Sequence, residues 1–185
     1  NTICIPKNSF ARSKQAFYIL TKEICTSLDI KHIHLRLGIP YSNKKDSNFF
    51  FNDVIKCIYK DEMVLLKNIY DVKDYINTSD IARGIVSLIS NDLEGVFNLS
   101  FGQGVEIKSV LKMIYERLNK KFIFDESSSS IKKVFNLNID KIYSQSNWKP
   151  SISIWDGISL LIQEVKFENN PTIDQFTTRI RSLYK

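Results

Sequence analysis

An aromatic ring and a lysine four residues apart form the pattern with the clearest chemical meaning in this sequence. Phe10 and Lys14 would share one face of a helix, because residues four apart are neighbours on a helical surface. A tyrosine in the first position could exchange a proton with a substrate hydroxyl or ketone, because an adjacent ammonium lowers the phenol pKa from its usual value of about 10. Phe10 has no such proton, so the pattern keeps the cation and lacks the acid/base group.

Four further motifs follow in order along the chain. Residues 35–42 read Leu-Arg-Leu-Gly-Ile-Pro-Tyr-Ser, and residues 73–82 begin with Lys-Asp-Tyr-Ile. Residues 95–102 contain Phe-Asn-Leu followed by a turn, and residues 138–158 contain Asn-Ile-Asp-Lys, then Asn-Trp-Lys-Pro, then Trp-Asp-Gly-Ile. Together with the Phe10–Lys14 segment they resemble the later half of an extended short-chain dehydrogenase/reductase, the family of NAD(P)-dependent nucleotide-sugar epimerases, dehydratases and reductases.

The resemblance implies an α/β fold, namely the later half of a Rossmann-type doubly wound parallel sheet with a smaller α/β substrate domain. Residues 1–40 and 75–104 would be the remainder of the dinucleotide-binding domain. Residues 41–74 and 105–168 would form the substrate-binding part, and residues 169–185 a helical C-terminal tail. The implied ligands are NAD or NADP and a nucleotide-diphosphate sugar, and the implied assembly is a homodimer that pairs through the helix carrying Lys14.

The family's motifs also assign roles to individual positions. Phe10 occupies the place of the usual catalytic Tyr, and Lys14 would bind the nicotinamide ribose. Ile39 and Ser42 differ from the Asn and Gly that are usual in the family. Lys73 replaces an Arg that typically touches the substrate diphosphate, so it keeps the charge and loses the bidentate fork. The expected site residues are therefore catalytic Phe10 and Lys14, cofactor-binding Lys14, Leu37, Gly38 and Ile39, and substrate-binding Lys73 and Asn48, the last also being a candidate N-cap.

The Tyr-x-x-x-Lys motif can be assigned in a second register on the same helix, because Tyr18 and Lys22 match it literally. The interval from Lys22 to Arg36 is short for the helix end, turn and strand that the family places there, whereas the interval from Lys14 fits. We therefore favour the Phe10 register. Two functions follow from it: an enzyme that relays the proton by another group or water, or an inactive nucleotide-sugar-binding protein, natural or engineered.

No glycine-rich pyrophosphate turn occurs in the sequence, since Gly102 and Gly104 lack the third glycine of that motif. We therefore expect an N-terminal portion of the fold to be absent from this chain. Three widely spaced cysteines argue against a disulfide framework and for a reduced, cytoplasmic protein. No apolar run approaches the ~18 residues that cross a bilayer, so no membrane association is expected.

The net charge of +6 is compatible with an anionic ligand and a solvated surface. Acidic residues are scattered among the lysines and no nucleic-acid motif is present, so we expect no nucleic-acid partner. His32 and His34 alternate on one strand face without a nearby carboxylate or cysteine, so no metal site is expected.

Composition and periodicity predict one hydrophobic core and alternating helices and strands. An apolar stripe of Phe10, Phe17, Leu20, Ile24 and Leu28 marks the first helix. Thr78 or Ser79 is expected to cap the third helix, near whose start Asp80 suits the helix dipole. Helices are expected at 9–28, 48–59, 78–90, 107–118 and 173–183, strands or extended segments at 32–37, 63–66, 74–76 and 96–99, and a loop at 127–130.

Overall fold

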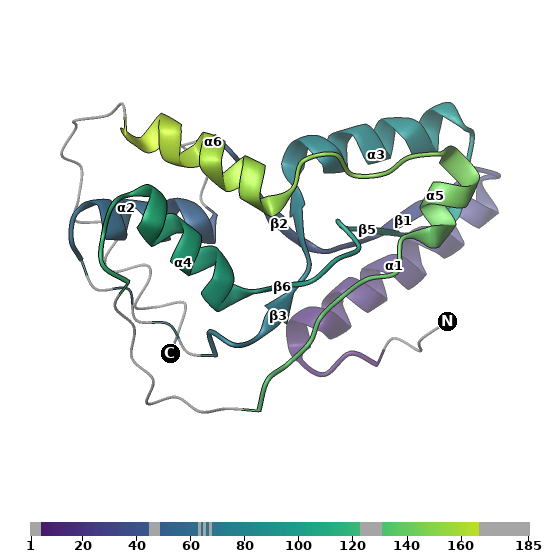
Figure 1. The fold of residues 1–185 in the computed structure, drawn as a ribbon. Helices are drawn as coiled ribbons and strands as arrows, with labels where there is room; N and C mark the ends of the chain where they lie inside the picture. Colours follow the sequence, from purple (N-terminus) through teal and green to yellow (C-terminus); the bar gives the residue numbers. More distant parts are fainter. Residues whose placement is uncertain are drawn as a thin grey trace.

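The computed structural model describes residues 5–44, 49–122 except 63, 65 and 67, and 131–166. Helices and short strands alternate along this part of the chain (Figure 1). In order they are α1 (Ser9–Ser27), β1 (Ile33–Leu37), β2 (Ile39–Tyr41), α2 (Phe50–Tyr59), β3 (Val72–Lys73), β4 (Tyr75–Asn77), α3 (Thr78–Ser90), β5 (Gly95–Leu99), β6 (Val105–Glu106), α4 (Ile107–Arg117), α5 (Asp140–Ser146) and α6 (Ile154–Lys166). The mixed α/β class predicted from the sequence is confirmed.

Parallel strands form the centre of the described fold. β1 pairs in parallel with β5, and β2 pairs in parallel with β4. The chain changes partner at Gly38, whose N–H donates to the Leu99 carbonyl at 2.8 Å, while the next N–H, that of Ile39, donates to the Asp74 carbonyl at 2.7 Å. α3 and α1 lie on opposite sides of β1 and β5 in Figure 1, as expected for a doubly wound sheet. β3 and β6 form a separate antiparallel pair.

Two helix starts show how side chains satisfy the first N–H groups. Asn8 is extended and its side chain accepts a hydrogen bond from the N–H of Ala11 at 2.8 Å. Asn77 does the same for the N–H of Ser79 at 2.9 Å and is the N-cap of α3. The prediction that Thr78 or Ser79 caps this helix is wrong by one or two residues, because the side-chain oxygen of Asn77 at the end of β4 already accepts from the N–H of Ser79.

Two hydrophobic clusters replace the single core predicted from composition. The larger cluster joins α2, α4 and α6, with residues such as Val54, Ile114 and Ile158 fully buried. The smaller one lies beneath α3 and contains Leu88, Leu99 and Trp148. The cores divide because α3 packs against β4 and α5 against β5, whereas α2 and α4 bury their apolar faces against α6.

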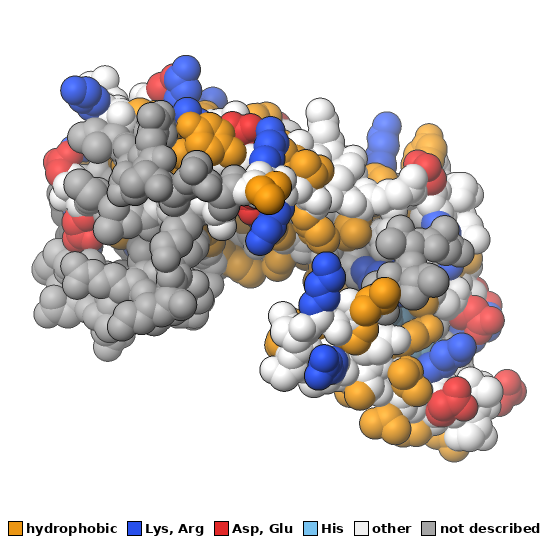
Figure 2. Space-filling view, turned by 90° about the horizontal axis from the view of Figure 1, so that it is seen from below, with side chains coloured by type: hydrophobic (Ala, Val, Ile, Leu, Met, Phe, Trp, Pro, Cys, Tyr) orange, Lys and Arg blue, Asp and Glu red, His pale blue; other side chains and the backbone are white. Residues whose placement is uncertain are grey.

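Helix α1 forms where it is predicted, but its apolar stripe is exposed. None of its residues is buried, and the exposed fractions of Phe10, Phe17 and Leu20 are 69%, 66% and 63%. Figure 2 shows hydrophobic side chains gathered over this part of the molecule. The stripe that marks this helix in the sequence therefore has no core to face among the described residues.

Several other predictions lie wholly or partly outside the described residues. The loop at 127–130, the helix at 173–183 and Asn48 fall there. Of the predicted extended segment 63–66, only Val64 and Leu66 are described, and neither belongs to a strand. No helix among the described residues is long and apolar enough to cross a membrane.

Candidate functional site

Phe10 and Lys14 lie in the first turns of α1. The ammonium of Lys14 is 5.4 Å from the centre of the Phe10 ring, so the predicted neighbourhood of the two side chains is present. α1 runs back along β1 in the opposite direction, which places these turns toward the carboxyl ends of β1 and β5 (Figure 1). In an open α/β sheet this is the edge at which ligands bind.

The expected cofactor segment, Leu37 to Ile39, lies at that same edge. Leu37 ends β1 with 41% of its surface exposed, whereas Gly38 is buried. A Cβ on Gly38 would overlap the hydroxyl of Ser100 and come within 2.9 Å of the Asp74 carbonyl oxygen. Gly38 therefore lets β1 approach the end of β5 and the start of β4, and no larger residue fits there.

Asp74 is a buried carboxylate that organises the loops at this edge, and sequence analysis gave it no role. One oxygen accepts from the N–H groups of Phe101 and Gly102 at 3.1 and 3.2 Å, and the other from the N–H of Leu137 at 3.0 Å. Asp74 is completely buried. The sequence feature that could have indicated this role is the position of Asp74 directly after Lys73 in the family motif.

Lys73, the expected diphosphate contact, lies on β3 opposite Val105 of β6. Directly opposed residues of an antiparallel pair project from the same face, so Lys73 and Val105 share a face. The Lys73 ammonium is 3.1 Å from the carboxylate of Asp71, and its side chain is 25% exposed. Burial opposes ionisation of Asp71, but the Lys133 N–H and the Lys73 ammonium outweigh it and hold the Asp71 pKa below its usual range.

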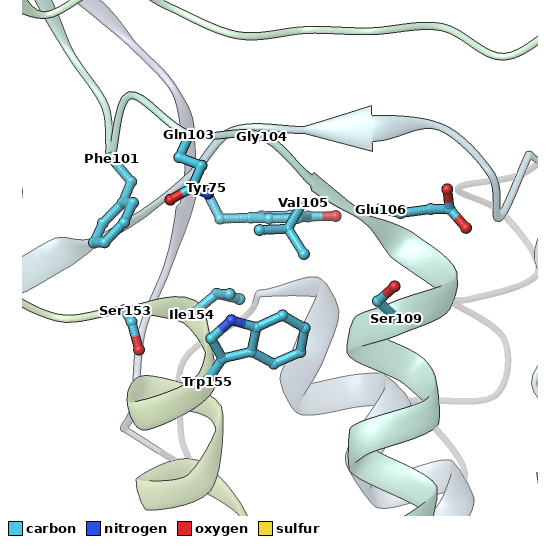
Figure 3. Close-up of a pocket in the computed structure, with 10 residues that line it drawn as sticks. All are labelled: Tyr75, Phe101, Gln103, Gly104, Val105, Glu106, Ser109, Ser153, Ile154 and Trp155. Atoms are coloured by element: carbon cyan, nitrogen blue, oxygen red, sulfur yellow. The ribbon is translucent and has the colours of Figure 1, made fainter.

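A cleft of about 430 Å³ opens beside Val105 (Figure 3). In Figure 3, Tyr75 and Val105 form one wall, and Ile154 and Trp155 at the start of α6 form the other. Ser109 and Glu106 lie toward one end and Phe101 toward the other. Sequence analysis assigned none of the cleft residues to a site, because they come from three separate segments: Tyr75, then Phe101, Gln103, Gly104, Val105, Glu106 and Ser109, then Ser153, Ile154 and Trp155.

Two buried polar groups fix the segment that leads into α6. Asp80 is completely buried and accepts hydrogen bonds from the N–H groups of Ser151 and Ile152 at 3.0 and 2.9 Å. It also pairs with Arg83. The Tyr41 hydroxyl donates to the Ser153 carbonyl at 2.9 Å, and burial raises the Tyr41 pKa, so this phenol stays neutral. Asp80 thus does more than complement the dipole of α3: it anchors the turn before Trp155.

The alternative register places Tyr18 against histidines rather than at the strand ends. The Tyr18 ring centre is 4.2 Å from that of His34 and 6.0 Å from that of His32. The His34 pKa is lowered by burial and by the neighbouring charge of Arg36. No group of three or more metal-binding side chains occurs among the described residues, and His32 and His34 are accounted for by these ring contacts.

Residues 1–160 match the family model described as GDP-mannose 4,6 dehydratase. The chain belongs to this family. Among related proteins, dTDP-4-dehydro-6-deoxyglucose reductase of Escherichia coli is 26% identical over 172 residues, which cover 88% of the chain and 54% of the reductase. Solved structures extend the comparison to the fold.

RMD from Pseudomonas aeruginosa, solved with NADPH, has a TM-score of 0.79 at 16% identity, covering 89% of this chain and 59% of that one. A second solved structure is a Tyr-to-Phe mutant of UDP-glucuronic acid 4-epimerase from Bacillus cereus with a fluorinated UDP-sugar and NAD. Its TM-score is 0.77 at 19% identity, and the match covers 90% of this chain and 55% of the epimerase. These similarities confirm the Rossmann-type fold. The chain spans about half the length of these relatives.

Proposed function

We propose that this chain is the substrate-binding part, with the adjoining edge of the dinucleotide-binding domain, of an NAD(P)-dependent epimerase, dehydratase or reductase acting on a nucleotide-activated sugar. The observation that carries the proposal is the placement of Lys73 on the same face as Val105, which lines the aromatic cleft. Lys73 does not itself line the cleft, but a cation on the face of a cleft residue, next to aromatic walls, suits a diphosphate joined to planar or cyclic groups.

In this proposal the cofactor binds at the carboxyl ends of β1 and β5. Lys14, Leu37, Gly38 and Ile39 fit the nicotinamide end of NAD or NADP, because the first turns of α1 and the exposed end of β1 both lie toward the edge where such ligands bind. They do not fit the pyrophosphate end, for which the sequence has no glycine-rich turn. The bound dinucleotide would accept or supply the hydride, while Lys14 would hold its ribose in place.

Phe10 changes the proton step of this chemistry. Oxidation of a sugar alcohol to a ketone removes a hydride from carbon and a proton from the hydroxyl, and Phe10 can neither take nor return that proton. Loss of a general acid/base lowers a rate by about 10² to 10⁴. Turnover by this chain would then need water or another group as proton carrier.

A second candidate is a nucleotide-sugar-binding protein without turnover. The same Phe10 favours it, because the phenyl ring keeps the contact with Lys14 and removes only the reactive hydroxyl. Both candidates require a nucleotide sugar to bind, and they differ in whether restoring the hydroxyl restores chemistry.

The domain boundaries expected from the sequence stay part of this proposal. Among the described residues β1 pairs only with β5, so the other edge of β1 would receive the rest of the dinucleotide-binding sheet. The two occupants use different surfaces: the rest of the sheet would extend from the free edge of β1, and a homodimer would pair through the exposed stripe of α1. The rest of the sheet would cover the free edge of β1 in either case, as part of the same chain or of another chain.

The direct test is binding of nucleotide sugars by calorimetry, with Lys73→Met as the disrupted form. UDP-, dTDP- and GDP-sugars form the panel, and Lys112→Met, which removes an exposed cation from α4, is the control. The proposal expects micromolar to millimolar binding that Lys73→Met weakens and Lys112→Met leaves unchanged. Absence of binding across the panel, or equal binding by all three proteins, would overturn it.

A further inference from the structure

The first turn of α6 carries a tryptophan that the hydrophobic cores do not use. Ile154 and Ile158 on either side of it belong to the larger core cluster, whereas Trp155 belongs to neither cluster and is 39% exposed. Its indole forms a wall of the cleft and points toward Val105 and Tyr75 (Figure 3). A large aromatic side chain at the mouth of a cleft is well suited to contact a ligand.

We propose that Trp155 is a ligand-binding residue that stacks on the nucleobase of the nucleotide sugar. This inference rests on the proposed function and adds which part of the ligand enters the cleft. Indole and base are both flat, polarisable ring systems, and such stacking is largely independent of which base is present. The cleft volume of about 430 Å³ is sufficient for a nucleoside.

The neighbouring charges define the direction in which the ligand lies. Lys73 is the cation on the face of Val105, and a diphosphate held there has a nucleoside on one side and a sugar on the other. The carboxyl ends of β1 and β5 take the reacting sugar in the proposed function, so the nucleoside is the part left for the cleft. Gln103 and Ser109, which also line the cleft, supply hydrogen-bonding groups for a base edge or ribose.

The indole is held by rigid structure rather than by a free loop. A Cβ on Gly157 would lie 2.5 Å from the Cε2 atom of Tyr41, so α6 is packed directly on the end of β2 two residues after Trp155. Asp80 fixes the N–H groups of Ser151 and Ile152 just before it. A residue positioned in this way loses little freedom when a ligand binds, which favours affinity.

Fluorescence provides a direct readout, because the chain has two tryptophans. Trp148→Phe leaves Trp155 as the single indole. The Trp148 side chain is 93% buried, and its Nε1 has no hydrogen-bond partner in the structure, so a phenyl ring removes no such bond. In this variant UDP, dTDP and GDP should each quench the remaining emission, whereas glucose 1-phosphate, which has a sugar and no base, should not.

Affinity measurements complete the test. Trp155→Ala should weaken nucleoside diphosphate binding by about 5- to 150-fold, and Trp155→Phe by less, because phenyl retains part of the stacking surface. The matched control is Tyr143→Ala, which removes a half-exposed aromatic from α5 away from the cleft and should leave affinity unchanged. Circular dichroism of each variant confirms that α6 is retained.

The outcomes separate this inference from the proposed function. If the unsubstituted chain binds no nucleoside diphosphate or nucleotide sugar, the proposed function fails and this inference with it. If it binds them, but Trp155→Ala binds equally well and the Trp155 emission does not respond, only the role of Trp155 is overturned. A response to glucose 1-phosphate and none to UDP would assign the cleft to the sugar and overturn the base assignment.

Discussion

Gly157 of α6 passes so close to Tyr41 of β2 that a Cβ at this position would lie 2.8 Å from Cζ of the phenol ring. Tyr41 is 1% exposed, and its hydroxyl donates to the Ser153 carbonyl at 2.9 Å. One strand end is therefore joined to the helix start that carries Trp155. The edge expected to receive the cofactor and the wall of the cleft are parts of one packed unit.

The first prediction concerns this contact. Gly157→Ala should lower the free energy of unfolding by about 1–3 kcal/mol, because the added methyl meets a buried ring with no room to move. Urea unfolding followed by circular dichroism measures the change. Gln163→Ala on the exposed side of α6 is the control and should change stability by less than about 0.5 kcal/mol. Equal stability of Gly157→Ala and the unsubstituted chain would show that the contact can relax.

The second prediction concerns the acid/base role that the proposed function assigns to position 10. Phe10→Tyr should raise the turnover of a nucleotide sugar by about 10² to 10⁴, because it restores an acid/base group beside Lys14. The assay follows NAD(P)H absorbance in the presence of the complementary dinucleotide-binding part. Tyr18→Phe is the matched control and should have no effect, since that ring lies against His34. Loss of turnover in Tyr18→Phe, with no gain in Phe10→Tyr, would establish the alternative register.

The third prediction concerns Asp74. Asp74→Ala should destabilise the fold by about 3–5 kcal/mol, since it leaves the N–H groups of Phe101, Gly102 and Leu137 without their acceptor. Asp92→Ala is the control, because it removes a mostly exposed carboxylate that pairs with Lys31. Thermal unfolding should separate the two variants clearly. A shift of the same size in both would mean that the Asp74 hydrogen bonds contribute no more than a surface ion pair.

The fourth prediction is a pH dependence that follows from Asp71. Its pKa is lowered in the folded state, so its stabilising contribution is complete above the unfolded-state pKa of about 3.9. That contribution is lost as pH falls from this value through the lower folded-state pKa. The stability difference between the unsubstituted chain and Asp71→Asn should therefore be constant near neutrality and shrink below pH ~4. A difference that grows on acidification would contradict the assigned direction.

The fifth prediction concerns the exposed stripe of α1. Leu20→Glu should reduce self-association of this chain, because Leu20 is 63% exposed within an apolar face that also contains Phe17 and Ile24. Sedimentation velocity measures the effect. Ile89→Glu, at a 64% exposed position on α3, is the matched control on the other side of the sheet. A monomeric unsubstituted chain at all concentrations would remove the proposed dimer.

Local sequence rules predicted the elements well where the pattern is internal to one segment. α3 spans residues 78–90, as its periodicity and polar start predict, and β5 extends the predicted strand by one residue. Family motifs likewise placed Lys14 beside Phe10 and put Gly38 at a strand end. These features depend on neighbours within a few positions, so hydrophobic period and motif spacing were sufficient.

The residues of the cleft and the buried contacts that hold them could not be predicted from local sequence patterns. Tyr75, Val105 and Trp155 lie in different segments and meet only when β3 pairs with β6 and α6 packs on β2. The buried roles of Asp74 and Asp80 depend on distant N–H groups, and the exposure of the α1 stripe depends on what packs against it. By itself the sequence determined the α/β class, the family resemblance and the presence of Phe rather than Tyr four residues before Lys14, because these follow from residue identity and local spacing. Only the tertiary structure decided which side chains share a site, because burial and contact arise from chain segments brought together over long separations.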